Sequence, residues 1–221
     1  MMTTNQEFKN AALASLRGNW APAVLASLIY AAITCLVSGA SSIYEVYYPE
    51  MFAVGGIVPP AFYGLTGGAA LIAIFILIPL SVGFTNAFNA LYVWSNSNIL
   101  GNTFGYGFKI YWRAIGGSLL VSIFTALWSL LLVIPGIIKA YSYALTPYIL
   151  VDDPELSVRD AIRKSQRLME GQKFNLFYLQ LSFIGWFFLA CVTCGIGFLW
   201  LIPYYQSTVA VFYNNLRNAN E

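Results

Sequence analysis

Residues 115–151 read IGGSLLVSIFTALWSLLLVIPGIIKAYSYALTPYILV and carry one charged side chain, Lys139. As a continuous helix this run would be about 55 Å long, whereas the hydrocarbon core of a bilayer is about 30 Å thick. The run is therefore too long for one crossing and short for two. We interpret it as a tight hairpin with crossings at residues 111–128 and 129–150. The alternative is one crossing plus an interfacial segment, which would place residues 151–173 outside.

The segment that follows this run decides between the two arrangements. Residues 151–173 carry five basic side chains, which are Arg159, Arg163, Lys164, Arg167 and Lys173. Short loops rich in Lys and Arg stay cytoplasmic, which favours the hairpin. Ser157 and Asp160 have the spacing of a capping box, and apolar residues then recur with helical periodicity. We predict a cytoplasmic amphipathic helix here, with its basic side chains on lipid headgroups.

The whole chain has the composition of a polytopic membrane protein. Of its 221 residues, 59% are apolar and 9% are charged, against about 25% charged in a soluble domain. The long uncharged stretches are each long enough to cross a bilayer. We predict an all-α bundle forming a single membrane domain, residues 1–221. Its about six transmembrane helices form three hairpins, at residues 20–40, 68–94, 111–128, 129–150, 174–193 and 196–216.

The connecting segments complete this layout. Thr4 and Glu7 have capping-box spacing, so residues 1–19 are predicted to form a second amphipathic helix on the cytoplasmic surface, with Lys9 and Arg17 reaching lipid phosphates. Residues 41–67 are predicted as an external loop. The stretch rich in Ser, Asn and Gly at residues 95–107 is predicted to return the chain to a cytoplasmic loop that ends at Lys109 and Arg113.

The distribution of basic residues gives the orientation. Ten of the eleven fall in predicted cytoplasmic segments, and the eleventh is Lys139. We therefore expect a multi-pass protein of a bacterial inner membrane with both termini in the cytoplasm. The first residues lack the apolar core and cleavage site of a signal peptide, so we expect no cleavage. The expected partners are the bilayer, anionic lipid headgroups and other membrane proteins, with no nucleic acid.

The even-numbered crossings share a proline. An aliphatic pair precedes Pro79, Pro135 and Pro203, and small, polar and aromatic residues follow each. Proline removes a helix hydrogen bond, so we predict a kink at each position. One interpretation is a threefold repeat whose bent helices put a polar lining in the cytoplasmic half of the bundle, as broken helices do in transporters. The alternative is a chance match, since kinks are common in membrane helices.

Six polar residues could line such a pocket, namely Lys139, Ser142, Thr146, Asn86, Asn89 and Gln206. Lys139 is the sharpest candidate, because a charge in mid-membrane is costly and usually functional. Its alternative is a side chain that extends to the interface if the hairpin turn lies at Pro135. The amides have an alternative as well, because hydrogen bonds between membrane helices are usually structural.

The sequence gives little support for metal, cofactor or redox chemistry. It has no histidine, the commonest metal ligand. Asp152, Asp153 and Glu155 could bind Mg²⁺ together with a lipid phosphate, or could simply pair with nearby basic residues. Cys191 and Cys194 form a Cys-x-x-Cys pair at a predicted outer turn, without the context of a redox motif. We predict no metal, no cofactor and no enzymatic activity.

Several blocks of residues resemble one known family. Residues 134–143 (IPGIIKAYSY) and 146–150 (TPYIL), then residues 181–186, 195–200 and 203–204, are similar to bacterial integral membrane proteins catalogued as domain of unknown function 975. The resemblance implies a helical membrane fold and no established reaction, substrate or cofactor. A more distant similarity to the membrane domains of glycerophosphodiester phosphodiesterases implies a lipid-related or membrane-organising role, without that enzyme's catalytic residues.

Two functions fit these observations. The first is a non-enzymatic membrane protein that binds or passes a lipid, peptide or other amphipathic molecule through a pocket near Lys139. The second is an accessory protein that organises membrane partners and has no substrate of its own. An intramembrane enzyme ranks last, because the sequence shows no paired acid and base.

Overall fold

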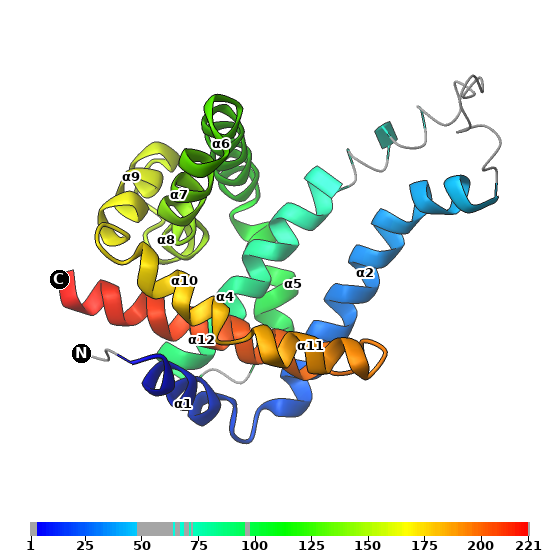
Figure 1. Ribbon diagram of the computed structural model, residues 1–221, viewed down its shortest axis with the longest axis horizontal. Coiled ribbons are helices and arrows are strands. Elements are labelled where there is room, and N and C mark those ends of the chain that lie inside the picture. Colours follow the sequence, from blue (N-terminus) through cyan, green and yellow to red (C-terminus); the bar gives the residue numbers. More distant parts are fainter. Residues whose placement is uncertain are drawn as a thin grey trace.

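The computed structural model of the chain describes residues 4–47, 64, 67–68, 71, 73–95 and 98–220. Within these residues every regular element is helical, as the sequence predicted (Figure 1). In chain order the elements are α1 (Asn5–Leu16), α2 (Trp20–Tyr47), the π-helical turn η2 (Ala73–Leu77), α4 (Ile78–Trp94), α5 (Ile99–Lys109), α6 (Tyr111–Leu131), α7 (Val133–Tyr143), α8 (Thr146–Asp152), α9 (Val158–Leu168), α10 (Lys173–Leu181), α11 (Ile184–Val192) and α12 (Phe198–Asn220).

Three arms extend from a common base (Figure 1). α2 and α4 form the first arm, α6 and α7 the second, and α10 and α11 together with α12 the third. The base contains α1, α8, α9 and the C-terminal part of α12, whereas α5 packs along α4 in the first arm (Figure 1). The arms correspond to the three predicted hairpins.

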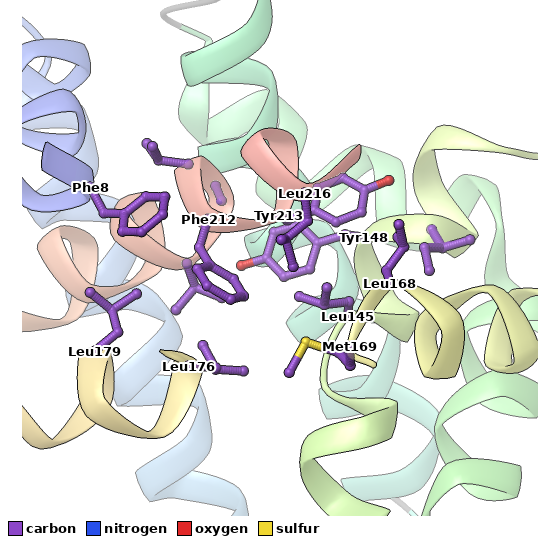
Figure 2. Close-up of a cluster of buried hydrophobic side chains, with 14 of the residues drawn as sticks. Phe8, Leu145, Tyr148, Leu168, Met169, Leu176, Leu179, Phe212, Tyr213 and Leu216 are labelled. Carbon is purple, nitrogen blue, oxygen red and sulfur yellow. The ribbon is translucent and has the colours of Figure 1, made fainter. Parts of the chain in front are cut away.

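The base holds the largest hydrophobic core, which is built around α12 (Figure 2). Tyr213 stacks on Tyr148 of α8 with ring centroids 5.0 Å apart, and Phe212 meets Phe8 of α1 edge-to-face at 5.4 Å. Such aromatic pairs add about 0.5–1.5 kcal/mol each to the stability gained by burying their area. Segments far apart in the sequence are thus joined at one place, and the arms project from it.

The arms expose apolar side chains rather than burying them. Leu36, Leu130 and Val192, one from each arm, are 77%, 85% and 80% exposed. Water would strongly disfavour such a surface, whereas lipid tails would not. Among the described residues, four helical stretches are long and apolar enough to cross a membrane, namely Trp20–Val37, Ile74–Trp94, Tyr111–Leu131 and Lys173–Val192.

The prediction of a loop at residues 95–107 is wrong for most of this stretch, because helix α5 occupies residues 99–109. The Asn98 side chain accepts a hydrogen bond from the Gly101 amide at 3.0 Å and caps the helix. α5 then packs closely on α4, since a Cβ on Gly107 would lie 1.7 Å from the Pro79 carbonyl oxygen. Asn98 was a readable cap signal, but the glycines that favoured a loop in the sequence serve helix packing instead.

The ends of the predicted crossings shift in the structure. α2 continues to Tyr47, beyond residue 40, and most of the expected external loop at residues 41–67 lies outside the described residues. The second turn is at Leu132, where the backbone is extended, rather than at residues 128–129. The fourth crossing is divided between α7 and α8, and the sixth lies within α12. The number of six crossings therefore stays a prediction.

Both amphipathic helices begin as their spacing predicted. Thr4 caps α1 through a full capping box with Glu7. The Ser157 hydroxyl accepts a hydrogen bond from the Asp160 amide at 3.2 Å and caps α9. α9 buries Ala161, Ile162, Ser165 and Leu168 and packs against α6, α7, α8 and α12. Local rules were sufficient here because a cap is made within four residues of sequence.

Candidate functional site

A polar cluster in the base joins α4, α8 and α12. The Asn89 amide donates to Asp152 Oδ1 over 2.9 Å, and Arg217 Nη1 donates to Asp152 Oδ2 over 2.8 Å. Asn214 donates to Asn89 Oδ1 over 2.7 Å. Burial raises the pKa of the Asp152 carboxyl, and the Arg217 guanidinium opposes that shift only in part. This cluster holds helices together, which agrees with the structural alternative for Asn89.

The other acids near α8 are placed differently. Asp153 Oδ2 lies 2.6 Å from Lys164 Nζ, and the Arg113 guanidinium donates to the backbone carbonyls of Asp153 and Leu156. Glu155 is exposed. In the described part of the chain, no three His, Cys, Asp or Glu side chains gather as metal ligands. Pairing with basic residues, the alternative to Mg²⁺, is therefore what Asp152 and Asp153 do.

The six residues predicted to line one pocket lie in different places. Lys139 Nζ sits 4.9 Å from the centroid of the Trp128 ring, across the α6–α7 seam. The Ser142 hydroxyl donates to the Ile138 carbonyl at 2.9 Å within its own helix. Thr146 lines a cavity between α6, α7 and α8. Lys139 lies in the second arm and Thr146 lies where that arm meets the base. The Lys139 side chain contacts Trp128, whereas the Thr146 side chain lines the cavity.

The amides are also separated. Asn86 and Asn89 are buried on α4. Gln206 instead lines a groove in the third arm, which we name the α10–α12 groove. The structure therefore distributes the six residues over the base, the second arm and the third arm.

The α10–α12 groove has a volume of about 420 Å³. Its lining includes Gln180, Phe183, Phe187, Phe198, Leu201, Tyr205 and Gln206. Most of the wall is therefore aliphatic or aromatic, with two amides and one phenol as its polar groups. A ligand site of ordinary size is about 300–1,000 Å³ and has this character, namely apolar walls with a few polar groups.

Hydrogen bonds fix the polar end of the groove. Tyr141 of α7 donates to Gln180 Oε1 over 2.6 Å, and Gln180 Nε2 donates to the Tyr205 hydroxyl over 2.8 Å. The side-chain amide of Gln206 lines the same groove and makes no side-chain hydrogen bond within the described part of the chain. One amide is thus held rigidly, and a second is available to a bound molecule.

Sequence reasoning missed Tyr141, Gln180 and Tyr205. Gln180 carried a signal, since it is an amide in the middle of a predicted crossing, at residues 174–193. The tyrosines carried none, because the chain has 15 tyrosines and their pairing depends on how α7, α10 and α12 pack.

The basic residues predicted to contact headgroups are divided. Arg159, Arg163 and Arg167 are exposed on α9, although Arg163 also lies 3.4 Å from Asp160 in an exposed ion pair. Lys164 is paired with Asp153. Lys173 is half-buried at the start of α10, beside an apolar cleft between α7 and α10. The three arginines thus remain available to a membrane surface.

Lys9 is a buried lysine, and the prediction that it contacts a lipid phosphate is wrong. Its Nζ donates to the Ser182 carbonyl at 3.0 Å and lies 4.5 Å from the Phe183 ring centroid. Burial lowers the pKa of this ammonium group. The Ser182 carbonyl is available because α10 ends there, so Lys9 joins α1 to the junction between α10 and α11.

The three prolines and the cysteine pair occupy distinct settings. Pro79 follows the π-helical turn η2, Pro135 follows the break at Leu132, and Pro203 lies inside α12. Cys191 and Cys194 have free, exposed thiols at the tip of the third arm. The kinks stay predictions. Pro79 lies near a change of helix type, Pro135 near a helix start and Pro203 inside a long helix.

A family model described as protein of unknown function (DUF975) matches residues 129–220. The match covers less than half of the chain and supports the resemblance to this family that residues 129–220 show in the sequence. No curated protein and no solved structure matches the chain. The similarity to glycerophosphodiester phosphodiesterases stays a prediction.

The DUF975 region contains the helices that form the candidate site. It runs from the end of α6 through α12, so it includes α7, the whole α10–α12 groove and most of the polar cluster. The first arm, α1 and α5 lie outside it. The blocks at residues 134–150 and 195–204 that carry the resemblance lie inside it.

Proposed function

We propose that this chain is a bacterial inner-membrane protein with both termini in the cytoplasm, and that it binds an amphipathic molecule, a lipid or a peptide, in the α10–α12 groove. The exposed apolar arms support insertion in a bilayer. The basic residues of α9 and of the ends of the chain support a cytoplasmic base.

The composition of the groove carries the proposal. Phe187, Phe198 and Leu201 offer an apolar wall to a hydrocarbon tail or an apolar side chain. Gln180, Tyr205 and Gln206 offer hydrogen bonds to a polar head, and an amide can both donate and accept. The lining contains no Asp, Glu, Lys or Arg, which supports binding of a neutral polar head rather than acid–base catalysis.

The test is to identify what co-purifies with the protein. The full chain is purified in mild detergent, and bound lipids and peptides are extracted and quantified by mass spectrometry. We expect one molecular class to be retained by the wild type and reduced about fivefold by Gln206→Leu, because one hydrogen bond of about 1 kcal/mol is lost. Gln166→Leu, on α9 and away from the groove, is the matched control and should retain the molecule.

One outcome would contradict the proposed binding site. If wild type, Gln206→Leu and Gln166→Leu retain the same molecules in the same amounts, the groove is not a binding site. Equal protein levels for the three variants exclude misfolding as the cause of a difference.

A further inference from the structure

The fourth predicted crossing is interrupted at residues 144–145. α7 ends at Tyr143 and α8 begins at Thr146. Pro147 has no N–H to donate to the Tyr143 carbonyl, which a continuous helix would require. The Ser142 carbonyl instead accepts a hydrogen bond from the Ser165 hydroxyl of α9 at 2.9 Å. The C-terminal carbonyls of α7, where the helix dipole is negative, therefore lie at an interruption in the helix.

A cavity of about 270 Å³ adjoins this break. From α6 it is lined by Ser118, Ser122 and Thr125, whose spacing of four and three residues places them on one helix face. Thr125 is about 21 Å along α6 from Tyr111 and Ser118 is about 10 Å, so the hydroxyls lie at mid-depth if α6 crosses the membrane.

The side chain of Thr146 independently indicates that this cavity holds a ligand. It lines the same cavity and is 1% exposed. Its Oγ1 is buried and has no hydrogen-bond partner in the part of the chain that the structure describes. Most buried hydroxyls have a partner, since a buried polar atom left without one destabilises the fold. A ligand in the cavity would supply that partner.

We propose that this cavity binds a monovalent cation such as Na⁺. The polar side chains that line it all carry neutral hydroxyls, which come from α6, from Tyr143 of α7 and from Thr146 of α8, and oxygen ligands suit a hard cation. Its lining has no carboxylate, so a divalent ion would lack the charge that compensates its dehydration. Interrupted helices whose C-terminal ends coordinate Na⁺ are a known way to build such a site in a membrane. The volume leaves room for the ion to keep part of its water.

Lys139 is the fixed positive charge nearest along the helix. It lies seven residues before Thr146, about 10 Å along the axis, and its Nζ is held over the Trp128 ring. The ring face attracts the ammonium group away from the break. Lys139 therefore limits the affinity of the site for a cation without occupying it.

The experiment measures cation-dependent stability. The full chain is reconstituted in nanodiscs, and thermal unfolding is followed by tryptophan fluorescence in NaCl, with choline chloride replacing it at constant ionic strength. We expect the Tm of the wild type to rise saturably with Na⁺ by about 3 °C, because a ligand that binds only the folded state stabilises it. Choline, which is too large for direct coordination, should give no rise.

Two variants make the test specific. Thr146→Val keeps the side-chain shape and loses no hydrogen bond, so it should fold and should lose the Na⁺-dependent rise. Thr34→Val on α2 is the matched control, since its hydroxyl bonds to the Tyr30 carbonyl at 2.9 Å in another arm; it should keep the rise. Equal rises in wild type and Thr146→Val, no difference between Na⁺ and choline, or a stronger effect of MgCl₂ would each overturn the proposal. The site does not depend on the α10–α12 groove.

Discussion

Asp152 connects three helices through its carboxylate. It sits at the end of α8, accepts hydrogen bonds from α4 and α12, and has a side chain 13% exposed. A buried carboxylate is tolerated when a cation and donors surround it, and removal of the cation leaves the charge uncompensated. We expect Arg217→Met to lower the free energy of unfolding by about 2 kcal/mol at pH 7.5, measured by thermal unfolding.

The pH dependence of that loss identifies its cause. Burial already raises the pKa of Asp152, so protonation favours the folded state, and this contribution is lost as the pH rises through the folded pKa. Without Arg217 the pKa rises further. The deficit of Arg217→Met should therefore shrink as the pH is lowered from 7.5 toward the unfolded value near 3.8. A deficit that is constant over this range would mean that lost packing, not charge, is the cause.

At the scale of elements, the contact between α4 and α5 is the most tightly constrained. A Cβ added to Gly107 would lie 1.7 Å from the Pro79 carbonyl oxygen and 2.9 Å from the Gly83 amide nitrogen, and all three atoms involved belong to rigid helices. We expect Gly107→Ala to lower the free energy of unfolding by about 1–3 kcal/mol, because the helices must separate.

The control for this prediction lies two residues away. Gly105 is on the same helix, and a Cβ there would meet nothing within 4 Å. Gly105→Ala should raise the free energy of unfolding by about 0.5–1 kcal/mol through helix propensity alone. If the two substitutions change stability in the same direction and by similar amounts, the close packing of α4 on α5 is not what stabilises this pair.

At the scale of the whole molecule, the layout of base and arms predicts a topology. α9 and the end of α12 lie together in the base, so they must share one side of the membrane (Figure 1). We expect a green fluorescent protein fused after Gln166 or after Leu216 to fluoresce, and alkaline phosphatase at both positions to be inactive, because the cationic segments stay cytoplasmic. Active phosphatase at both positions would reject the orientation, and opposite results at the two would reject the shared base.

Different parts of the protein were predictable to different degrees. The capping boxes of α1 and α9 and the apolar arms follow from short sequence patterns, because a cap or a hydrophobic run is a local property. The break at residues 144–145 could not be predicted from Pro147, because a proline in a membrane helix is compatible with a kink, with a break or with an uninterrupted helix. α5 was hidden because its glycines indicate a loop until α4 is placed beside it.

The sequence by itself determined that this is an all-helical chain with several apolar spans, where its basic residues gather, and how two of its helices begin. These properties depend on hydrophobicity, charge and spacing over a few residues. Only the tertiary structure decided that Lys9 is buried against Ser182, that Asp152 pairs with Arg217, and that Gln180 and Gln206 line one groove while Thr146 lines another cavity. The physical reason is that a polar side chain in a helix bundle takes its partner from whichever helix packs against it, and that choice is made by the whole set of helix contacts rather than by neighbouring residues.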